Sequence, residues 1–227
     1  MKSLVKENER VLIVAAHPDD ETIGMGGSIR RFTEIGCSVR VVFLSDGVSS
    51  RDVQRESLVK RQNSSLAALS HLGVSDVYFS GNPDNMLDTL PLLEIAKQIE
   101  FHVLDFNPKT VFTHFPFDLN VDHKLVSEAT QIACRPKVSS PVNGLLFFEV
   151  ASSTNWHFGL NQFTPNYFID ITTTLSSKEK ALQEYAAELD SFPNSRSLEN
   201  LVNLSRTRGS FIGFEAAEAF QIAFIRE

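Results

Sequence analysis

The sequence predicts an α/β fold with a Rossmann-like, doubly wound and mostly parallel sheet, formed by a single domain over residues 1–227. Short apolar runs alternate along the chain with longer charged or amphipathic segments, which is the pattern of strands and helices in such sheets. The first apolar run is short and bounded by breakers, as in buried parallel strands. A chain of 227 residues also has ample length for one core.

The first half of the chain is predicted to consist of repeated strand–helix units. Apolar or β-branched runs predict four strands, at Arg10–Ala16, Cys37–Leu44, Asp76–Phe79 and Thr110–Thr113. Charged or amphipathic segments predict four helices, at Gly24–Ile35, Arg51–Leu72, Leu90–Asp105 and Asp122–Ala133. The breakers that end the first three helices are Gly36, Gly73 and Asn107-Pro108.

The second half is less regular but continues the same fold. Further strands are predicted at Gly144–Val150, Tyr167–Ile171 and Glu218–Ile225. Two more helices are predicted, at Ser176–Leu189 and Leu198–Thr207. The polar and aromatic stretch Ala151–Pro165 is predicted to form a long loop near the functional site rather than a domain boundary.

Composition narrows the class of protein. The chain is 42% hydrophobic and 22% charged, as ordinary soluble proteins are, and its net charge of −7 comes without a basic patch. A nucleic-acid partner is therefore not expected, and neither is stable membrane insertion or a leader peptide. Cys37 and Cys134 are expected to be buried free thiols. The predicted location is the cytoplasm.

Two polar clusters follow predicted strands. His17-Pro18-Asp19-Asp20-Glu21 follows the first strand, and His114 through His123 follows the fourth. Because the carboxyl ends of parallel strands share an edge, the clusters can converge. His17, Asp20 and His123 would then offer two imidazoles and one carboxylate, which suits Zn²⁺ and also Fe²⁺. Asp19 would lie beside the ion as a base; the alternative is a capping acid next to a turn histidine.

These residues carry a resemblance to a known family. Ala16-His17-Pro18-Asp19-Asp20-Glu21, followed by glycines, resembles the signature of the PIG-L/LmbE-like zinc deacetylases, and the similarity covers nearly the whole chain. Weaker matches are Asp46-Gly47, Leu72-Gly73-Val74, Pro83-Asp84 with Leu87, Pro108 with Val111, Thr113-His114, Asp118 with Asp122-His123, Ile169-Asp170-Ile171, Lys180-Ala181-Leu182 and Ala217-Glu218-Ala219-Phe220. The resemblance implies hydrolysis of an N-acetyl group, usually on an N-acetylglucosamine moiety.

The resemblance also implies roles for individual residues. The metal ligands would be His17, Asp20 and His123, and the general base would be Asp19. Residues that match sugar-binding positions are Arg61 and Asp84, whose other interpretations are a solvated helix charge and a loop acid. Asp122 would orient a neighbouring ligand, unless it only caps a helix.

Two positions depart from the family pattern. Asn120 stands where many relatives have a histidine, and its amide can donate to an oxyanion but cannot carry a proton. The general-acid role therefore falls to Asp19 acting twice, or to His114. Ser64 replaces a usual glutamate three residues after Arg61, which leaves the partner of Arg61 undetermined.

Aromatic residues near the clusters are candidates for the walls of the substrate pocket. Phe115 and Phe117 could enclose the acetyl group, and Trp156 and His157 could line the sugar cleft or simply pack. The run Gly24-Met25-Gly26-Gly27 suggests a nucleotide-binding loop, but its spacing is wrong and acids precede it.

The main hypothesis is thus a zinc-dependent hydrolase that removes acetate from a small amino-sugar substrate. A second is an amidase acting on a thiol conjugate, or a deacylase for an antibiotic-type glycoside with a longer acyl chain. A third is a metal-free module that binds a sugar or nucleotide. A homo-oligomer is compatible with the aromatic content.

Overall fold

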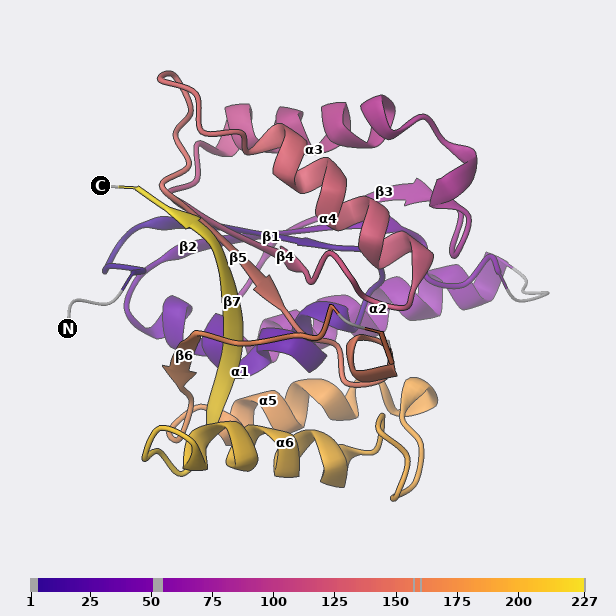
Figure 1. Cartoon of the computed structure of the whole chain (residues 1–227). Coiled ribbons are helices and arrows are strands. Elements are labelled where there is room, and N and C mark those ends of the chain that lie inside the picture. Colours follow the sequence, from indigo (N-terminus) through magenta and orange to yellow (C-terminus); the bar gives the residue numbers. More distant parts are fainter. Residues whose placement is uncertain (1–3, 51–54, 157, 160, 227) are drawn as a thin grey trace.

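The computed structural model describes residues 4–50, 55–156, 158–159 and 161–226. They form one seven-stranded sheet in the order β3-β2-β1-β4-β5-β7-β6 (Figure 1). Its strands are β1 (Arg10–Ala15), β2 (Ser38–Ser45), β3 (Asp76–Asn82), β4 (Thr110–His114), β5 (Gly144–Phe148), β6 (Tyr167–Asp170) and β7 (Ala217–Ile225). The first five pair in parallel, whereas β7 is antiparallel to β5 and β6. The predicted mostly parallel α/β fold is confirmed.

Helices cover both faces of the sheet. One face carries α3 (Leu92–Phe106) and α4 (Val121–Ala133), as Figure 1 shows. The opposite face carries α1 (Asp20–Glu34), α2 (Arg55–His71), α5 (Leu175–Gln183) and α6 (Leu198–Ser210). Three short 3₁₀ turns, at Leu87–Thr89, Thr154–Trp156 and Ala186–Glu188, lie in the connections.

The strand β1 shows why the sheet needs helices on both sides. Val11, Ile13 and Ala15 belong to the core under α1, whereas Leu12 and Val14 belong to the core under α3 and α4. Side chains alternate between the faces of a strand, and in β1 both sets are apolar and fully buried. A continuous apolar run is what a strand covered on both faces requires.

The prediction that α1 begins at Gly24 is wrong, because the helix begins at Asp20. The carboxylates of Asp20 and Glu21 lie in its first turn, where the positive end of the helix dipole favours them. The helix is interrupted at Met25, which has φ −151° and ψ 24°. The polar cluster after β1 thus continues directly into a helix, and this fixes the direction of its side chains.

The glycines of α1 serve helix packing rather than a nucleotide loop. A Cβ atom on Gly24 would lie 2.6 Å from the ring of Phe148, and one on Gly27 would lie 2.8 Å from the side chain of Ile171. Both distances are shorter than a real contact allows. The small residues therefore let α1 approach β5 and the end of β6 closely.

The helix predicted over Ser176–Leu189 is shorter in the structure. It ends at Gln183, and the chain then forms the 3₁₀ turn Ala186–Glu188. The break turns the chain toward the carboxyl ends of the strands and brings Glu188 into the functional site.

Both thiols are buried and free, as predicted. Cys37 precedes β2 and so lies one position outside the strand predicted to begin with it, whereas Cys134 directly follows α4, which ends at Ala133 as predicted. None of the helices in the described part of the chain is long and apolar enough to cross a membrane.

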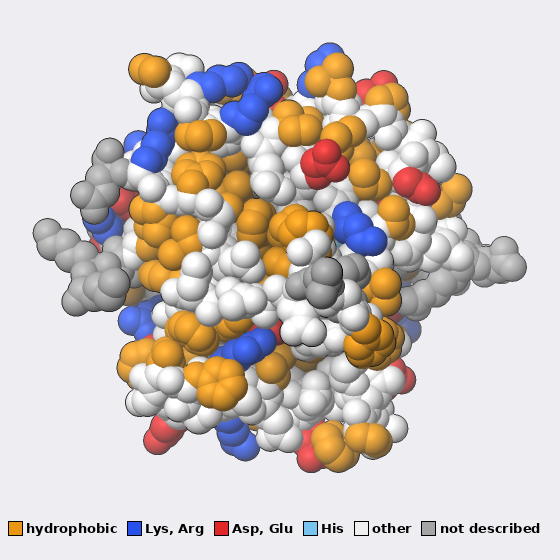
Figure 2. All heavy atoms as spheres, in the orientation of Figure 1, with side chains coloured by type: hydrophobic (Ala, Val, Ile, Leu, Met, Phe, Trp, Pro, Cys, Tyr) orange, Lys and Arg blue, Asp and Glu red, His pale blue; other side chains and the backbone are white. Residues whose placement is uncertain are grey.

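Hydrophobic side chains reach the surface at several places on the face drawn in Figure 2. Large exposed ones include Phe211 and Phe214 after α6, and Trp156 and Phe158 in the long loop. A homo-oligomer stays a prediction that these observations do not test.

Candidate active site

The polar clusters converge where the strand order reverses. β1 lies between β2 and β4, so the chain leaves the carboxyl ends of β1 and β4 in opposite directions. His17 follows β1, Asp20 begins α1, and His123 lies in the first turn of α4. This switch point is where open α/β sheets bind their ligands.

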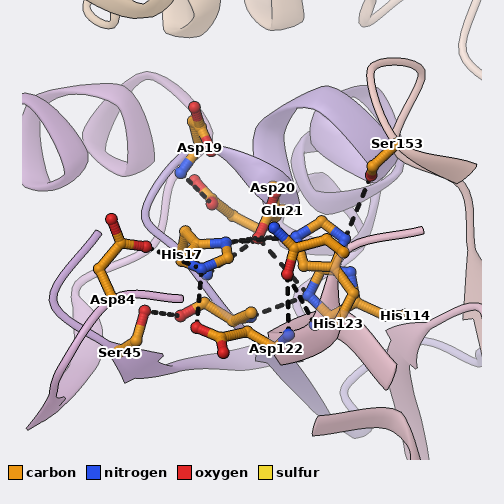
Figure 3. Close-up of polar contacts among 12 residues, drawn as sticks. His17, Asp19, Asp20, Glu21, Ser45, Asp84, His114, Asp122, His123 and Ser153 are labelled. Carbon is orange, nitrogen blue, oxygen red and sulfur yellow. Dashed lines mark hydrogen bonds and ion pairs between the residues drawn. The ribbon is translucent and has the colours of Figure 1, made fainter. Parts of the chain in front are cut away.

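Three donor atoms meet there, and Figure 3 shows their side chains pointing toward one another. His17 Nδ1 lies 3.2 Å from Asp20 Oδ2 and 3.2 Å from His123 Nε2, and His123 Nε2 lies 3.2 Å from Asp20 Oδ2. Ligands about 2.0–2.1 Å from a tetrahedral zinc ion lie roughly 3.3 Å apart. The donor set therefore fits a metal ion, and all three residues are buried.

In each imidazole, the nitrogen that points away from Asp20 contacts a carboxylate; we call it the far nitrogen. His17 Nε2 lies 3.1 Å from Asp122 Oδ2 and 3.1 Å from Asp84 Oδ1. His123 Nδ1 lies 3.2 Å from Asp118 Oδ1. A proton on each far nitrogen leaves a lone pair on the nitrogen that faces Asp20, which is the tautomer a metal ligand needs.

Charge pairing dominates the electrostatics of this group. Burial alone would lower the pKa of His123, but Asp20 and Asp118 raise it to about 9. Burial alone would raise the pKa of Asp20, but His123 and His17 hold it well below its ordinary value. Positive charge next to Asp20 is therefore stabilised, and a dication would supply such charge.

Asp122 contacts His17 and also holds the loop between β3 and α3. Its two oxygens accept the backbone N–H groups of Asn85 and Leu87, at 2.8 and 3.1 Å. The cap of α4 is Asn120, whose side-chain oxygen accepts the N–H groups of Asp122 and His123. The alternative interpretation of Asp122 as the N-cap is thus wrong.

Asp19 lies next to the donor group in a strained backbone conformation. Its φ of 132° is one that residues other than glycine rarely adopt, and its N–H donates to Glu21 Oε2 at 3.0 Å. Burial raises the pKa of the Asp19 carboxyl, although Arg196 and Arg61 oppose the shift. Oδ2 receives both guanidinium groups, with Arg61 Nη2 at 3.0 Å. Oδ1 has no hydrogen bond or ion pair to a described residue.

The partner of Arg61, undetermined from sequence, is Glu188. Arg61 Nη1 lies 2.6 Å from Glu188 Oε1, while Nη2 binds Asp19. Glu188 and Arg196 are functional-site residues that the sequence analysis missed. Glu188 falls in the last turn of the helix predicted over Ser176–Leu189, and Arg196 falls in the irregular segment before α6. No metal-type spacing marks either residue.

His114 lies behind the donor group. Its ring stacks on His123 with centroids 3.9 Å apart, and its Nε2 accepts the N–H of Ala16 at 2.8 Å. Burial and the neighbouring His123 lower its pKa well below the ordinary value, so the ring is neutral. It is not among the residues that line the cavity.

A cavity of about 270 Å³ opens in front of the donor atoms. Of the predicted residues, its lining includes His17, Asp19, Asp20, Arg61, Asp84, Asn120, His123 and Trp156. Phe115 and Phe117 do not line it: the first is buried and the second is 45% exposed. His157 lies outside the described residues.

Comparison with known proteins defines the class. The PIG-L family model, described as GlcNAc-PI de-N-acetylase, matches residues 12–134, which is more than half of the chain. With the buried His–Asp group, this match defines a deacetylase, a hydrolase that acts on amides. The chain belongs to the PIG-L family.

Individual relatives extend this similarity beyond the family model. A probable N-acetyl-alpha-D-glucosaminyl L-malate deacetylase 2 of Bacillus anthracis is 27% identical over 81% of this chain and 83% of its own. The N,N'-diacetylchitobiose deacetylase of Pyrococcus horikoshii superposes with a TM-score of 0.75, at 22% identity over 94% of this chain and 83% of the other. The 4-carboxy-2-hydroxymuconate hydratase GalB of Pseudomonas putida KT2440 also has a TM-score of 0.75, at 23% identity over 96% of this chain and 98% of the other. Because a hydratase has this fold, the fold by itself does not define the reaction.

Proposed function

We propose that this protein hydrolyses the N-acetyl amide of an amino-sugar derivative of the N-acetylglucosamine type and releases acetate and a free amine. The observation that carries the proposal is the donor group of His17, Asp20 and His123, which lies beside Asp19 in one cavity. The Bacillus anthracis relative, whose name specifies a glucosaminyl substrate, supports an amino sugar. The reaction would belong to glycan, glycoconjugate or thiol-cofactor biosynthesis.

The donor set suits zinc, with Fe²⁺ as the alternative. His17, Asp20 and His123 would hold the ion, which when bound acidifies water and polarises the acetyl carbonyl. Asp118 and Asp122 would hold the two imidazoles in the ligand tautomer, because each lies on a far nitrogen.

Asp19 would move the proton. Its Oδ1 is the oxygen that no described side chain engages, and the two arginines fix the carboxylate through Oδ2. Oδ1 would take a proton from the attacking water as the new C–O bond forms. It would return that proton to the departing nitrogen as the C–N bond breaks, so that one residue serves as base and then acid.

Asn120 would stabilise the oxyanion. Its Oδ1 caps α4, and one N–H of its Nδ2 donates to Asn85 Oδ1 at 2.9 Å. The second N–H remains for the substrate, and the residue lines the cavity. His114 would support His123 by stacking rather than transfer protons, because it is buried behind that ring. Arg61 and Asp84 would bind sugar hydroxyls from the cavity wall.

The deciding experiment pairs metal analysis with an activity panel. The purified protein is expected to contain one zinc or iron ion per chain and to release amine from N-acetylglucosamine conjugates until a chelator is added. Bound metal with amine release only from longer acyl groups would move the assignment to a deacylase. Absence of bound metal after metal supplementation would contradict the ligand assignment of His17, Asp20 and His123.

The role of Asp19 can be tested separately. Asp19→Asn should keep the metal but lower kcat by about 10²–10⁴, the usual contribution of a positioned general base. Glu128→Gln, an exposed change on α4, is the control and should leave both quantities unchanged. Full activity of Asp19→Asn would remove Asp19 from the proton transfer.

A further inference from the structure

A buried ion pair lies next to the interruption of α1. It joins Lys178 on α5 to Glu218 on β7, with Nζ and Oε1 2.6 Å apart, and each residue is only 3% exposed. Both α5 and β7 pack against α1, which is interrupted at Met25 (Figure 1). Neither residue lines the cavity in front of the donor atoms. Two buried charges are tolerated only where further hydrogen bonds hold them.

Those hydrogen bonds go to the backbone of α1. In a continuous helix the N–H of Gly27 would donate to the C=O of Ile23. Here the N–H groups of Gly27 and Ser28 donate to the two carboxylate oxygens of Glu218, at 3.0 and 2.7 Å. The C=O of Ile23 accepts Lys178 Nζ at 2.8 Å. The ion pair thus supplies partners for the backbone groups on both sides of the interruption.

The turn before the interruption carries the site. The N–H of Ile23 donates to the C=O of Asp19 at 2.9 Å, while its C=O is held by Lys178. Asp19 has a φ of 132°, and such a strained backbone persists only where its surroundings hold it. Asp20 follows directly as the first residue of α1. One helical turn therefore connects the ion pair with the proposed base and the carboxylate ligand.

The competing conformation is a continuous helix. Without the ion pair, the N–H of Gly27 and the C=O of Ile23 could bind each other, which would redirect the first turn. The glycines in this part of α1 lower its own helix propensity. Gly26 also leaves room for the pair, since a Cβ atom there would lie 3.2 Å from Lys178 Cγ. The conformation of α1 thus depends on the contacts from α5 and β7.

We propose that Lys178 and Glu218 are positioning residues, which hold α1 in its interrupted conformation and thereby place Asp19 and Asp20 for proton transfer and metal binding. The part that concerns proton transfer rests on the proposed deacetylase function. The ion pair then controls metal affinity and turnover, and not the stability of the fold alone.

The test is the double variant Lys178→Met/Glu218→Gln. It removes both charges at similar side-chain volume, so that neither is left buried without its partner. Zinc affinity, measured by competition with a chromogenic chelator, should fall by about 10- to 100-fold, as it does when a residue that orients a ligand is lost. The visible absorption spectrum of the Co²⁺-loaded protein should change, because Asp20 moves. The kcat for amine release from an N-acetylglucosamine conjugate should fall by about 10- to 100-fold as well.

The matched control removes a neighbouring ion pair. Arg208 Nη2 lies 2.7 Å from Glu149 Oε2, and both residues line the same small cavity as Lys178 and Glu218. Among the described residues, neither side chain of the control pair bonds to the backbone of α1. Arg208→Met/Glu149→Gln should lower the melting temperature but keep the zinc affinity, cobalt spectrum and kcat of the wild type. Lys97→Gln, an exposed change on α3, should alter none of these quantities.

A milder variant decides the question if the double variant does not fold. In Gly26→Ala, the added Cβ meets the stem of Lys178, and alanine favours the continuous helix. Zinc affinity should fall by about fivefold, the equivalent of the difference in helix propensity between glycine and alanine.

The outcomes separate this proposal from the deacetylase assignment. Zinc affinity and a cobalt spectrum like those of the wild type, in every α1-contact variant that folds, would overturn the positioning role. An equal loss of zinc affinity in Arg208→Met/Glu149→Gln would overturn it too, because any buried ion pair would then have the same effect. The predicted metal readouts without amine release from the wild type would contradict the deacetylase function and keep the positioning role. A wild type that binds neither zinc nor cobalt would overturn both.

Discussion

At the scale of single residues, the histidines of the site depend on their far-side carboxylates. Asp118 Oδ1 lies 3.2 Å from His123 Nδ1, and Asp118 also accepts the hydroxyl of Thr154. Asp118→Ala would let the ring of His123 change tautomer and rotate. We expect zinc affinity to fall by about 10- to 100-fold, the usual cost of losing such a partner, when measured by competition with a chromogenic chelator.

The control for this change is Glu128→Gln, on an exposed position of α4, which should bind zinc like the wild type. Unchanged affinity in Asp118→Ala would mean that the stack with His114 and the contact with Ser153 are enough to orient His123.

Tyr185 is the second residue whose effect can be predicted from contacts. Its hydroxyl donates to Glu21 Oε1 at 3.0 Å, and Oε2 of the same carboxylate accepts the N–H of Asp19. Burial raises the pKa of Glu21 to about 7. Tyr185→Phe leaves this buried acid one donor short, at a cost of about 1–3 kcal/mol. The melting temperature should fall by about 2–12 °C, since each kcal/mol shifts it by about 2–4 °C in a chain of this size.

Differential scanning calorimetry measures this shift. Tyr78→Phe, on a side chain that is 39% exposed, is the matched control and should change the melting temperature by less than about 1 °C. Equal effects of the two substitutions would show that the Tyr185–Glu21 contact adds nothing to stability.

At the scale of helices and strands, the two thiols lie at the ends of elements, where they are buried from solvent and thiol reagents. Cys134 follows α4 and Cys37 precedes β2, and both are buried. Burial raises the pKa of Cys134 to about 12 and also raises that of Cys37. Native protein at pH 8 should therefore give no rapid reaction with Ellman's reagent, whereas unfolded protein should titrate two thiols.

The same shift predicts a pH dependence of stability. The unfolded thiol ionises near pH 9 and the folded one only near 12, so the contribution of Cys134 is complete below pH 9. It should be lost as the pH rises from 9 to 12. Cys134→Ser tests this by flattening the fall in melting temperature over that range; an unchanged slope would contradict it.

The elements also show what could be predicted from sequence. Strands covered on both faces are largely apolar runs, and therefore β1, β2, β4 and β5, which are buried along nearly their whole length, were predictable. The start of α1 was not, because Asp20 and Glu21 resemble a metal-binding turn and are also good first-turn residues of a helix. The roles of Glu188 and Arg196 could not be predicted from the sequence. Glu188 pairs with Arg61 and Arg196 pairs with Asp19 only because the chain before α6 folds back over the site.

At the scale of the whole molecule, the donor group ties together segments that are far apart in the sequence. His17 and Asp20 belong to the β1–α1 connection and His123 to α4, and their donor atoms lie 3.2 Å apart. Without an ion, only the two imidazoles balance the buried carboxylate of Asp20. An ion that binds only the folded state stabilises it by about 2.7 kcal/mol at one hundred times its dissociation constant.

Removal of the metal should therefore destabilise the entire fold rather than the site alone. At 2–4 °C per kcal/mol, stripping the ion with a chelator should lower the melting temperature by about 5–11 °C, and zinc should restore it. His123→Ala should have the lower melting temperature with or without zinc, whereas Lys97→Gln should respond like the wild type. If neither chelator nor zinc changes the melting temperature of the wild type, the His17–Asp20–His123 group is a network of hydrogen bonds and not a metal centre.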